Sequence, residues 1–190
     1  MYKRQPFVNS GETNSTFTTG ATLGKLPSVP PPAPLEIFAS ERYDANGGSE
    51  MEWEFPLPPG TIAEVRLYFA EIYSGITGGN QRVFDVNIEG EIMSSVDPIF
   101  EADGFLVGYV RSAVVKVDDG TLDIDFLHVI QNPAIKAIEI RKPNSLVASL
   151  PQLSRANGTT QDLELSLGLP FAGQTYLVMT SATGAAPGIP

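Results

Sequence analysis

Residues 64–90, EVRLYFAEIYSGITGGNQRVFDVNIEG, contain two alternating segments on either side of a glycine-rich loop. Apolar side chains take every second position from Val65 to Phe69, and again from Phe84 to Ile88. A period of two is typical of strands that bury one face. The loop holds three glycines and an asparagine, residues that favour exposed turns. The stretch therefore predicts a central hairpin with an exposed loop.

The same alternation predicts further strands on both sides of this stretch. They lie at residues 35–44, 51–55, 113–117, 122–126 and 134–142. Trp53 falls on the apolar phase of its segment, which places it in the core. Asp118-Asp119-Gly120 predicts a type I′ hairpin turn. Short strands separated by Gly/Pro turns are typical of an antiparallel β-sandwich, so we predict an all-β, jelly-roll-type sandwich over residues 35–142.

The segments outside the predicted strands differ in composition. Residues 1–34 form a Pro/Gly-rich lead-in, which we interpret as an incomplete edge of the sandwich. Residues 91–105 predict a connection whose Phe100 and Phe105 fill one end of the core. Residues 143–190 read as a linker followed by two strand patterns, DLELSL and TYLVMT. Because two strands cannot hold a core of their own, this part is either a truncated second β domain, our preferred interpretation, or a cover on the first.

Charge and composition restrict the class of partner. A net charge of −10 disfavours nucleic acid and anionic membranes. No run of about 18 apolar residues is present, so no membrane insertion is expected. The chain has no cysteine, which excludes cysteine nucleophiles and cysteine-based zinc sites. The opening MYKRQPF lacks the apolar region of a signal peptide.

Five segments, taken together, resemble a known family. They are FASERYD (38–44), VRLYFAEIY (65–73), RVFDVNIEG (82–90), DGTLDIDF (119–126) and NPAIKAIEI (132–140). Their order and separations resemble those of the malectin-type domain, a carbohydrate-binding β-sandwich of the galactose-binding-like kind. The similarity is greatest to bacterial versions, which are modules of large extracellular or surface proteins. Sugar binding is implied by this resemblance and not by composition.

The resemblance implies a binding role for individual residues. Tyr43 matches the family tyrosine in the ERY motif, and Tyr73 matches the tyrosine that follows FAE. The next family position is aromatic but is Ser74 here, and the acidic residue expected before the Asn-Pro pair is Gln131. Glutamine can hydrogen-bond a hydroxyl without charge assistance. The earliest family aromatic falls in the lead-in, where no residue is matched to it.

Sugar chemistry suits these residue types. An aromatic ring packs under the apolar face of a pyranose, while amides or carboxylates bind its hydroxyls at the rim. Tyr43 and Tyr73 would supply the rings, and Gln131, Asn132 and His128 the polar contacts, with no metal and no cofactor. A tyrosine at a strand end, however, more often caps the core, and a lone histidine after an apolar strand is more often a core or rim residue.

Two further sets of charged residues have spacings that point to an ion pair or to catalysis. Glu71 falls on the inward phase of its strand and needs a partner, so we predict a structural ion pair with Arg42 or Arg82. Asp123 and Asp125 share an outward strand face about 7 Å apart, a spacing compatible with a glycosidase pair. Neither lies where burial is predicted to raise a pKa, as an acid catalyst requires. We therefore predict no catalytic residue and no enzyme activity.

Two functions remain open from the sequence. The first is a non-catalytic, lectin-like module that binds an oligosaccharide or polysaccharide, with glucose as a candidate unit, beside other domains of an extracellular or cell-surface parent chain. The alternative is a structural or adhesive β-sandwich that has lost sugar binding, which Ser74 and Gln131 motivate. If Tyr43 and Tyr73 line one cleft, the first function is favoured.

Overall fold

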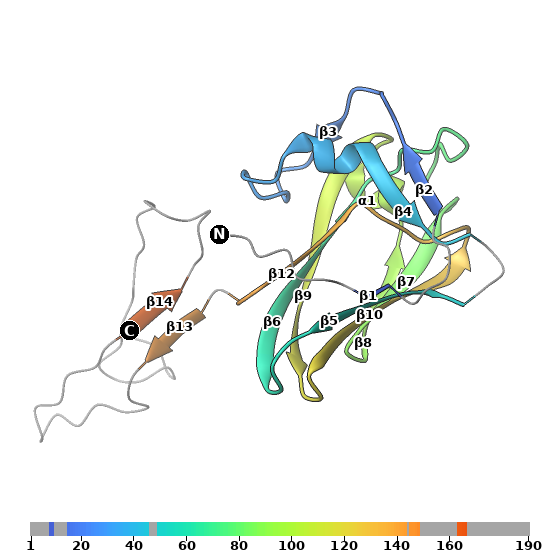
Figure 1. Cartoon of the computed structure of the whole chain (residues 1–190). Helices are drawn as coiled ribbons and strands as arrows, with labels where there is room; N and C mark the ends of the chain where they lie inside the picture. Colours follow the sequence, from blue (N-terminus) through green and yellow to red (C-terminus); the bar gives the residue numbers. More distant parts are fainter. Residues whose placement is uncertain (1–7, 10–14, 46–48, 144, 149–162, 167–190) are drawn as a thin grey trace, which may run out of the picture. The chain divides into compact units, whose positions relative to one another are not determined.

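The computed structural model describes residues 8–9, 15–45, 49–143, 145–148 and 163–166. The chain divides into two units, Met1–Pro143 and Asn144–Pro190. The described residues of the first unit form strands with two short helices between them (Figure 1). The predicted all-β class is confirmed.

The strands of the first unit follow in chain order. They are β1 (Val8–Asn9), β2 (Ser15–Thr18), β3 (Gly24–Lys25), β4 (Ser40–Tyr43), β5 (Met51–Pro56), β6 (Thr61–Phe69), β7 (Val83–Ile88), β8 (Glu91–Val96), β9 (Val107–Val117), β10 (Thr121–Ile130), β11 (Ala134–Ile135) and β12 (Ala137–Arg141). The helices are the 3-10 helix η1 (Leu35–Ala39) and the α-helix α1 (Pro98–Ala102).

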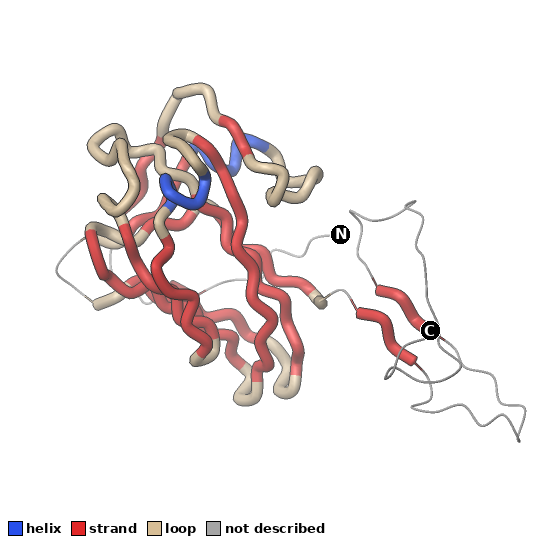
Figure 2. The backbone as a smooth tube through the Cα atoms, turned by 180° about the vertical axis from the view of Figure 1, so that it is seen from behind, coloured by secondary structure: helices blue, strands red, loops and turns tan. Residues whose placement is uncertain are grey.

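Two sheets face each other as the layers of a sandwich. One has the strand order β1-β5-β10-β7-β8 and the other β12-β6-β9-β3, while β11-β4-β2 forms a smaller sheet. The described neighbours pair antiparallel, except that β3 runs parallel to β9. Figure 2 shows the connecting loops gathered at the two ends of the long strands. The lead-in thus contributes one strand to each of the three sheets.

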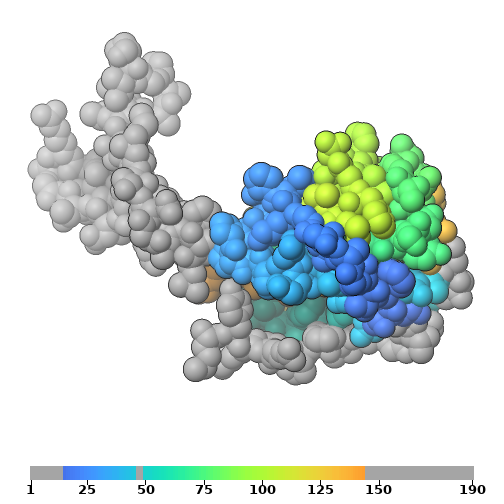
Figure 3. All heavy atoms as spheres, turned by 90° about the horizontal axis from the view of Figure 1, so that it is seen from above, coloured from blue at the N-terminus to red at the C-terminus, as the bar shows by residue number. Residues whose placement is uncertain are grey.

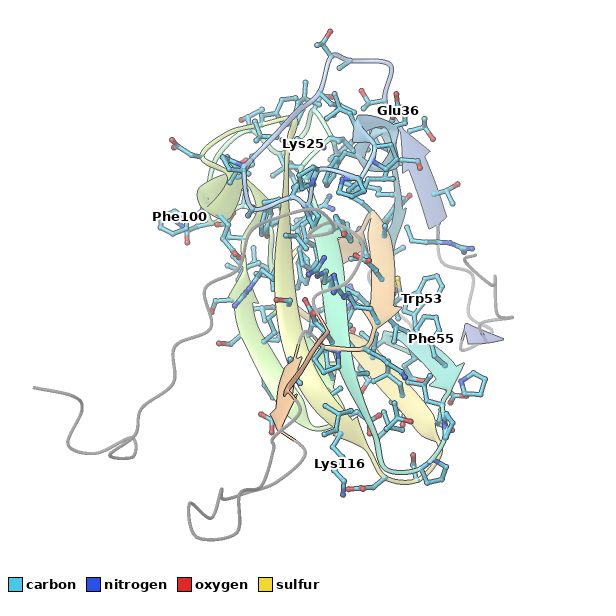
Figure 4. All side chains as sticks on the ribbon, turned by 90° about the vertical axis from the view of Figure 1, so that its left-hand side faces the viewer. Lys25, Glu36, Trp53, Phe55, Phe100 and Lys116 are labelled. Carbon is cyan, nitrogen blue, oxygen red and sulfur yellow. The ribbon has the colours of Figure 1, made fainter. Side chains whose placement is uncertain are left out.

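The core lies between the two layers and is filled by the predicted alternation. The buried inward side chains of β6, β7 and β10 are Val65, Leu67, Phe69, Phe84, Val86, Ile88, Leu122, Ile124 and Phe126. Trp53 of β5 belongs to the same cluster, and its ring stacks on Phe55 with centroids 6.5 Å apart (Figure 4). Each such side chain adds about 1.5–3 kcal/mol of transfer free energy, so this layer is the main source of stability.

A second apolar cluster covers the outer face of β6 near one end. Phe38 of η1 is fully buried there against Tyr68 and Ala70. The close approach depends on Gly108 of β9, because a Cβ at that position would lie 2.6 Å from the Phe38 ring. This contact holds η1 and the following strand β4 on the sandwich.

Neither of the two predicted hairpins forms. Strands β6 and β7 belong to opposite layers, as do β9 and β10. The segment between β6 and β7 buries its own Ile72 and Ile76, which makes it a crossover between layers instead of a turn. At the Asp118-Asp119-Gly120 connection only Gly120 has a positive φ, of 104°, whereas a type I′ turn needs two such residues.

Residues 35–39 form η1, where a strand is predicted, and β4 starts only at Ser40. In a 3-10 helix residues three apart share a face. Leu35 and Phe38 therefore point together into the second apolar cluster, which an extended segment would not allow.

Phe100 is 75% exposed, so the prediction that it fills the core is wrong. Asp97 Oδ1 accepts a hydrogen bond from the Phe100 backbone N–H at 3.1 Å and so caps α1. The helix buries Pro98 and Ala102, four residues apart, and a residue midway between them faces the other way. Phe100 accordingly projects away from the strands (Figure 4).

The second unit contains one described pair of strands. β13 (Ser145–Ala148) pairs antiparallel with β14 (Leu163–Ser166). β14 lies in the predicted strand DLELSL, whereas β13 lies in the segment interpreted as linker. The other predicted strand, TYLVMT, lies outside the described residues. Within the described part of the chain, no helix is long and apolar enough to cross a membrane.

Candidate functional site

A cleft opens at the end of the sandwich where β6 and β10 end and β7 begins. It has a volume of about 260 Å³ and is lined by Phe17, Glu41, Tyr43, Tyr73, Arg82, Gln131 and Asn132. Figure 3 looks onto the molecule from this end. The lead-in (blue) lies there beside the segment that connects β6 to β7 (green). Four of the predicted site residues, Tyr43, Tyr73, Gln131 and Asn132, therefore share one cleft.

Three aromatic rings surround the cleft. Tyr73 is 46% exposed, and Phe17 meets its ring edge-on, with centroids 5.7 Å apart and planes at 88°. Tyr43, at the end of β4, is half-buried and pairs in register with Ser15 of β2. Sequence reasoning missed Phe17, although the lead-in contains few aromatic residues that could have been considered. Its place opposite Tyr73 becomes visible only once β2 pairs with β4.

The polar rim is formed by the turn after β10. Gln131 has a φ of 60°, in the left-handed region that a residue other than glycine adopts only at some cost. Its Oε1 accepts a hydrogen bond from the Asn132 backbone N–H at 3.2 Å. The Gln131 amide is thus held by the backbone of Asn132, and both residues line the cleft.

Buried charges form the floor of the cleft. Arg82 Nε lies 3.0 Å from Glu71 Oε2, and Arg82 Nη1 lies 3.8 Å from Glu41 Oε1. Lys136, in the break between β11 and β12, is ion-paired with Glu41. All four side chains are nearly inaccessible, so two carboxylates and two cations compensate each other inside the domain. Of the two arginines proposed for Glu71, Arg82 is the one in contact.

Burial dominates the electrostatics of this floor. It raises the pKa of Glu71, although Arg82 and the Tyr73 backbone N–H act in the opposite direction. Burial also lowers the pKa of Lys136 to about 8, against the attraction of Glu41. The Tyr73 N–H donates to Glu71 Oε1 at 2.8 Å, so the floor is connected directly to one of the rings.

The stability of the first unit is expected to rise with pH above about 8. Lys136 has a pKa of about 8 in the folded domain, whereas the ordinary lysine pKa of 10.5 applies in the unfolded chain, so the unfolded chain binds more protons between these pH values. Burial raises the pKa of Tyr68 and Tyr109, whose contribution to stability is lost at still higher pH, above about 10. Urea unfolding from pH 7 to 11 should therefore show a maximum between these two limbs. The rising limb should amount to about 1–3 kcal/mol and be absent in Lys136→Met, whereas an equal rise in that variant would contradict the assignment.

His128 does not line the cleft, contrary to its predicted role. Its Nδ1 lies 2.6 Å from Glu50 Oε2, and Asp44 is close to both, with ligand atoms of the three residues within 4.8 Å of one another. These side chains are types that could hold a divalent cation. The hydrogen bond between His128 of β10 and Glu50, which directly precedes β5, already accounts for the position of these two side chains.

Asp123 and Asp125 also lie outside the lining of the cleft. They occupy the outward face of β10, where Asn87 Nδ2 donates to Asp125 Oδ2 at 2.9 Å. Burial raises the pKa of Asp123, with a further contribution from the Glu89 carboxylate, contrary to the sequence-based expectation. The pair belongs to the surface of a sheet and not to the site.

Comparison with protein families decides the family. The malectin domain model matches residues 2–144. The chain belongs to the malectin domain family. The matched range includes the lead-in, so the strand that carries Phe17 is part of the malectin domain.

Relatives of this malectin domain occur in longer proteins. Receptor-like protein 4 of Arabidopsis thaliana is 29% identical over 163 residues, which are 83% of this chain and 25% of that protein. The chain thus spans about a quarter of the length of the curated relative it matches.

Three solved structures share the fold. A chain in the crystal structure of plant peptide RALF23 with FER and LLG2 aligns with a TM-score of 0.64 and 22% identity over 73% of this chain and 41% of that one. The ANX2 ectodomain of Arabidopsis thaliana aligns with a TM-score of 0.61 and 16% identity over 69% of this chain and 40% of that one. β-Glucuronidase 2 of Bacteroides uniformis aligns with a TM-score of 0.55 and 19% identity over 75% of this chain and 15% of that one. At these identities the likeness shows a shared fold alone.

Proposed function

We propose that this malectin domain binds carbohydrate and catalyses no reaction. The observation that supports this most is the convergence of Phe17, Tyr43 and Tyr73 with the amides of Gln131 and Asn132 around one cleft. The ligand is an oligosaccharide or polysaccharide, with glucose as a candidate unit. It would stack a sugar face on a ring and place its hydroxyls against the amides.

The size and openness of the cleft support this ligand class. Its volume of about 260 Å³ is below the roughly 300–1,000 Å³ typical of sites for drug-sized ligands. One or two sugar rings of a longer glycan would fill it. Tyr73 is 46% exposed and Tyr43 is half-buried, so neighbouring chain does not seal these rings.

The charges in the cleft support a binding role without catalysis. Glycoside hydrolysis uses two carboxyl groups roughly 5–9.5 Å apart on either side of the bond that is cleaved. Among the residues that line the cleft, Glu41 is the carboxylate, and it is already paired with Lys136 and Arg82. The Glu41 carboxylate therefore has a structural role in the floor of the cleft and does not act as an acid or base.

We further propose that the domain is one module of a longer extracellular or cell-surface protein. A receptor-like protein is its relative in sequence, and a plant ectodomain shares its fold. Other domains of the same parent chain would then be its covalent neighbours. The bacterial setting implied by the sequence resemblance stays a prediction.

The alternative is a structural or adhesive module that has lost sugar binding. Ser74 and Gln131 favour it, because a family aromatic and a family carboxylate are missing from the loops around the cleft. Phe17 partly compensates for the missing aromatic residue, because it adds a third ring to the cleft, in contact with Tyr73. The two functions differ in one measurable property, which is affinity for glycans at the cleft.

The double variant Tyr43→Ala/Tyr73→Ala is expected to lose binding. Glycan-array screening followed by calorimetric titration with gluco-oligosaccharides should give an affinity that falls about 10-fold or more in this variant, because each ring contact is lost. Phe100→Ala is the matched control, since Phe100 is 75% exposed and outside the cleft. Unchanged affinity in the double variant would remove the proposed cleft, and absence of binding to every glycan would favour the structural module.

A further inference from the structure

We infer that Gly75 is a positioning residue for Tyr73, an inference that rests on the proposed sugar-binding function. The outer end of the Tyr73 ring lies over the backbone at Gly75. A Cβ placed on Gly75 would be 2.8 Å from Tyr73 Cζ and 3.0 Å from its hydroxyl oxygen. Both distances are shorter than van der Waals contact, so the ring can take its observed place only because residue 75 has no side chain.

The backbone of the loop does not itself require glycine here. The Ile76 N–H donates to the Tyr73 carbonyl oxygen at 3.0 Å, which makes Tyr73 the first and Gly75 the third residue of a β-turn. Among the glycines that the structure describes, Gly60, Gly90 and Gly120 have a positive φ, and Gly75 does not. Alanine would therefore fit the turn, and only the Tyr73 ring would be displaced.

Two other contacts hold Tyr73 in the same place. Glu71 Oε1 accepts the Tyr73 backbone N–H at 2.8 Å, and the buried partner of Glu71 is Arg82. Phe17 packs edge-on against the ring from β2. Tyr73 is thus held at its backbone by Glu71, while its ring lies against Phe17 and over Gly75. A ring fixed before the ligand arrives loses less conformational freedom on binding.

A methyl group at position 75 should affect binding and stability differently. The atoms that it would meet belong to the outer end of a side chain that is 46% exposed, so the ring can swing away into solvent. The turn remains anchored by Ile76, which is buried. The fold should therefore be unaffected while the stacking surface moves out of position.

Gly75→Ala is the test, and Gly78→Ala in the same loop is its matched control. A Cβ at Gly78 would make only an ordinary contact, 3.7 Å from Gln81 Nε2. Affinity is measured by calorimetry, with glucose trisaccharides of α-1,4 and β-1,3 linkage as probes. The ring position is measured without any ligand, as the nuclear Overhauser effect between the Tyr73 and Phe17 rings in selectively labelled protein. Thermal unfolding of each variant reports whether the fold is kept.

We expect Gly75→Ala to weaken binding about fivefold or more, to reduce the Tyr73–Phe17 effect and to leave the melting temperature unchanged. Gly78→Ala should match the wild type in all three. In a Tyr73→Ala background Gly75→Ala should cause no additional loss, because it acts through the ring. An additional loss there, or a wild-type affinity together with a wild-type ring contact in Gly75→Ala, would overturn the inference. If Tyr73→Ala binds the trisaccharides normally, the proposed cleft fails. If neither trisaccharide binds, glucose fails as the sugar unit. In both cases the ring contact alone decides whether Gly75 positions Tyr73.

Discussion

Arg82→Met is expected to lower the free energy of unfolding of the first unit by about 3–5 kcal/mol, because it leaves the buried Glu71 carboxylate without its cation. Arg82 contacts both Glu71 and Glu41, and water hardly reaches any of the three. Methionine keeps much of the side-chain volume, so the loss would report charge and not a cavity. Urea unfolding at pH 7 measures it directly.

Lys116→Met serves as the control for this prediction. Lys116 Nζ lies 2.5 Å from Asp118 Oδ1, but its side chain is 61% exposed, and such surface pairs contribute only about 0–1 kcal/mol. The deficit of Arg82→Met should also shrink toward acidic pH, because burial raises the pKa of Glu71 and protonation removes its charge. Equal losses in the two variants, or a deficit independent of pH, would argue against a floor held by charge compensation.

Phe38→Ala is expected to cost about 3–5 kcal/mol of unfolding free energy, the range for removing a fully buried aromatic ring. Phe38 packs η1 against the outer face of β6, where the centroid of its ring lies 6.2 Å from the centroid of the Tyr68 ring. The neighbouring Gly108 provides a second test of the same contact. Gly108→Ala should destabilise the wild type by about 1–3 kcal/mol through overpacking, and less once Phe38 is alanine.

Phe100→Ala is the matched control, because it removes the same ring from a side chain that is 75% exposed. Its effect should stay within about 0.5 kcal/mol, as for ordinary surface positions. A large loss there, or a small loss at Phe38, would contradict the role of Phe38 in holding η1 and β4 on the sandwich. Chemical unfolding of the wild type, the three single variants and the Phe38→Ala/Gly108→Ala double variant distinguishes these results.

The core could be predicted because alternation is a local property of the sequence. The inward phase of β6, β7 and β10 followed directly from the period of two, and so did the burial of Trp53 and Glu71. Layer assignment is not local. Nothing in the Gly-rich loop or in the Asp-Gly turn indicates whether the next strand pairs with its neighbour or crosses to the other sheet, so both hairpin predictions failed.

The candidate site was predictable only where the resemblance supplied motifs. Tyr43, Tyr73 and Asn132 came from segments that match the family, and Gln131 came from the position directly before one of them, where the family has an acidic residue. Phe17 and Lys136 enter the site or its floor through long-range pairing of β2 with β4 and of β11 with β4, which no single-segment pattern reports. The prediction that Phe100 fills the core failed because residues 98–102 form a short helix capped by Asp97 in place of the expected irregular connection.

The location of a bound glycan tests the central claim most directly. In a nuclear magnetic resonance titration of the wild-type protein with gluco-oligosaccharides, the largest shifts should fall on Phe17, Tyr43, Tyr73, Gln131 and Asn132, which line the cleft. The resonances of residues on the outward face of β10, such as Asp123 and Asp125, should not shift. Shifts centred on any other surface, with the cleft resonances unchanged at saturation, would contradict this account.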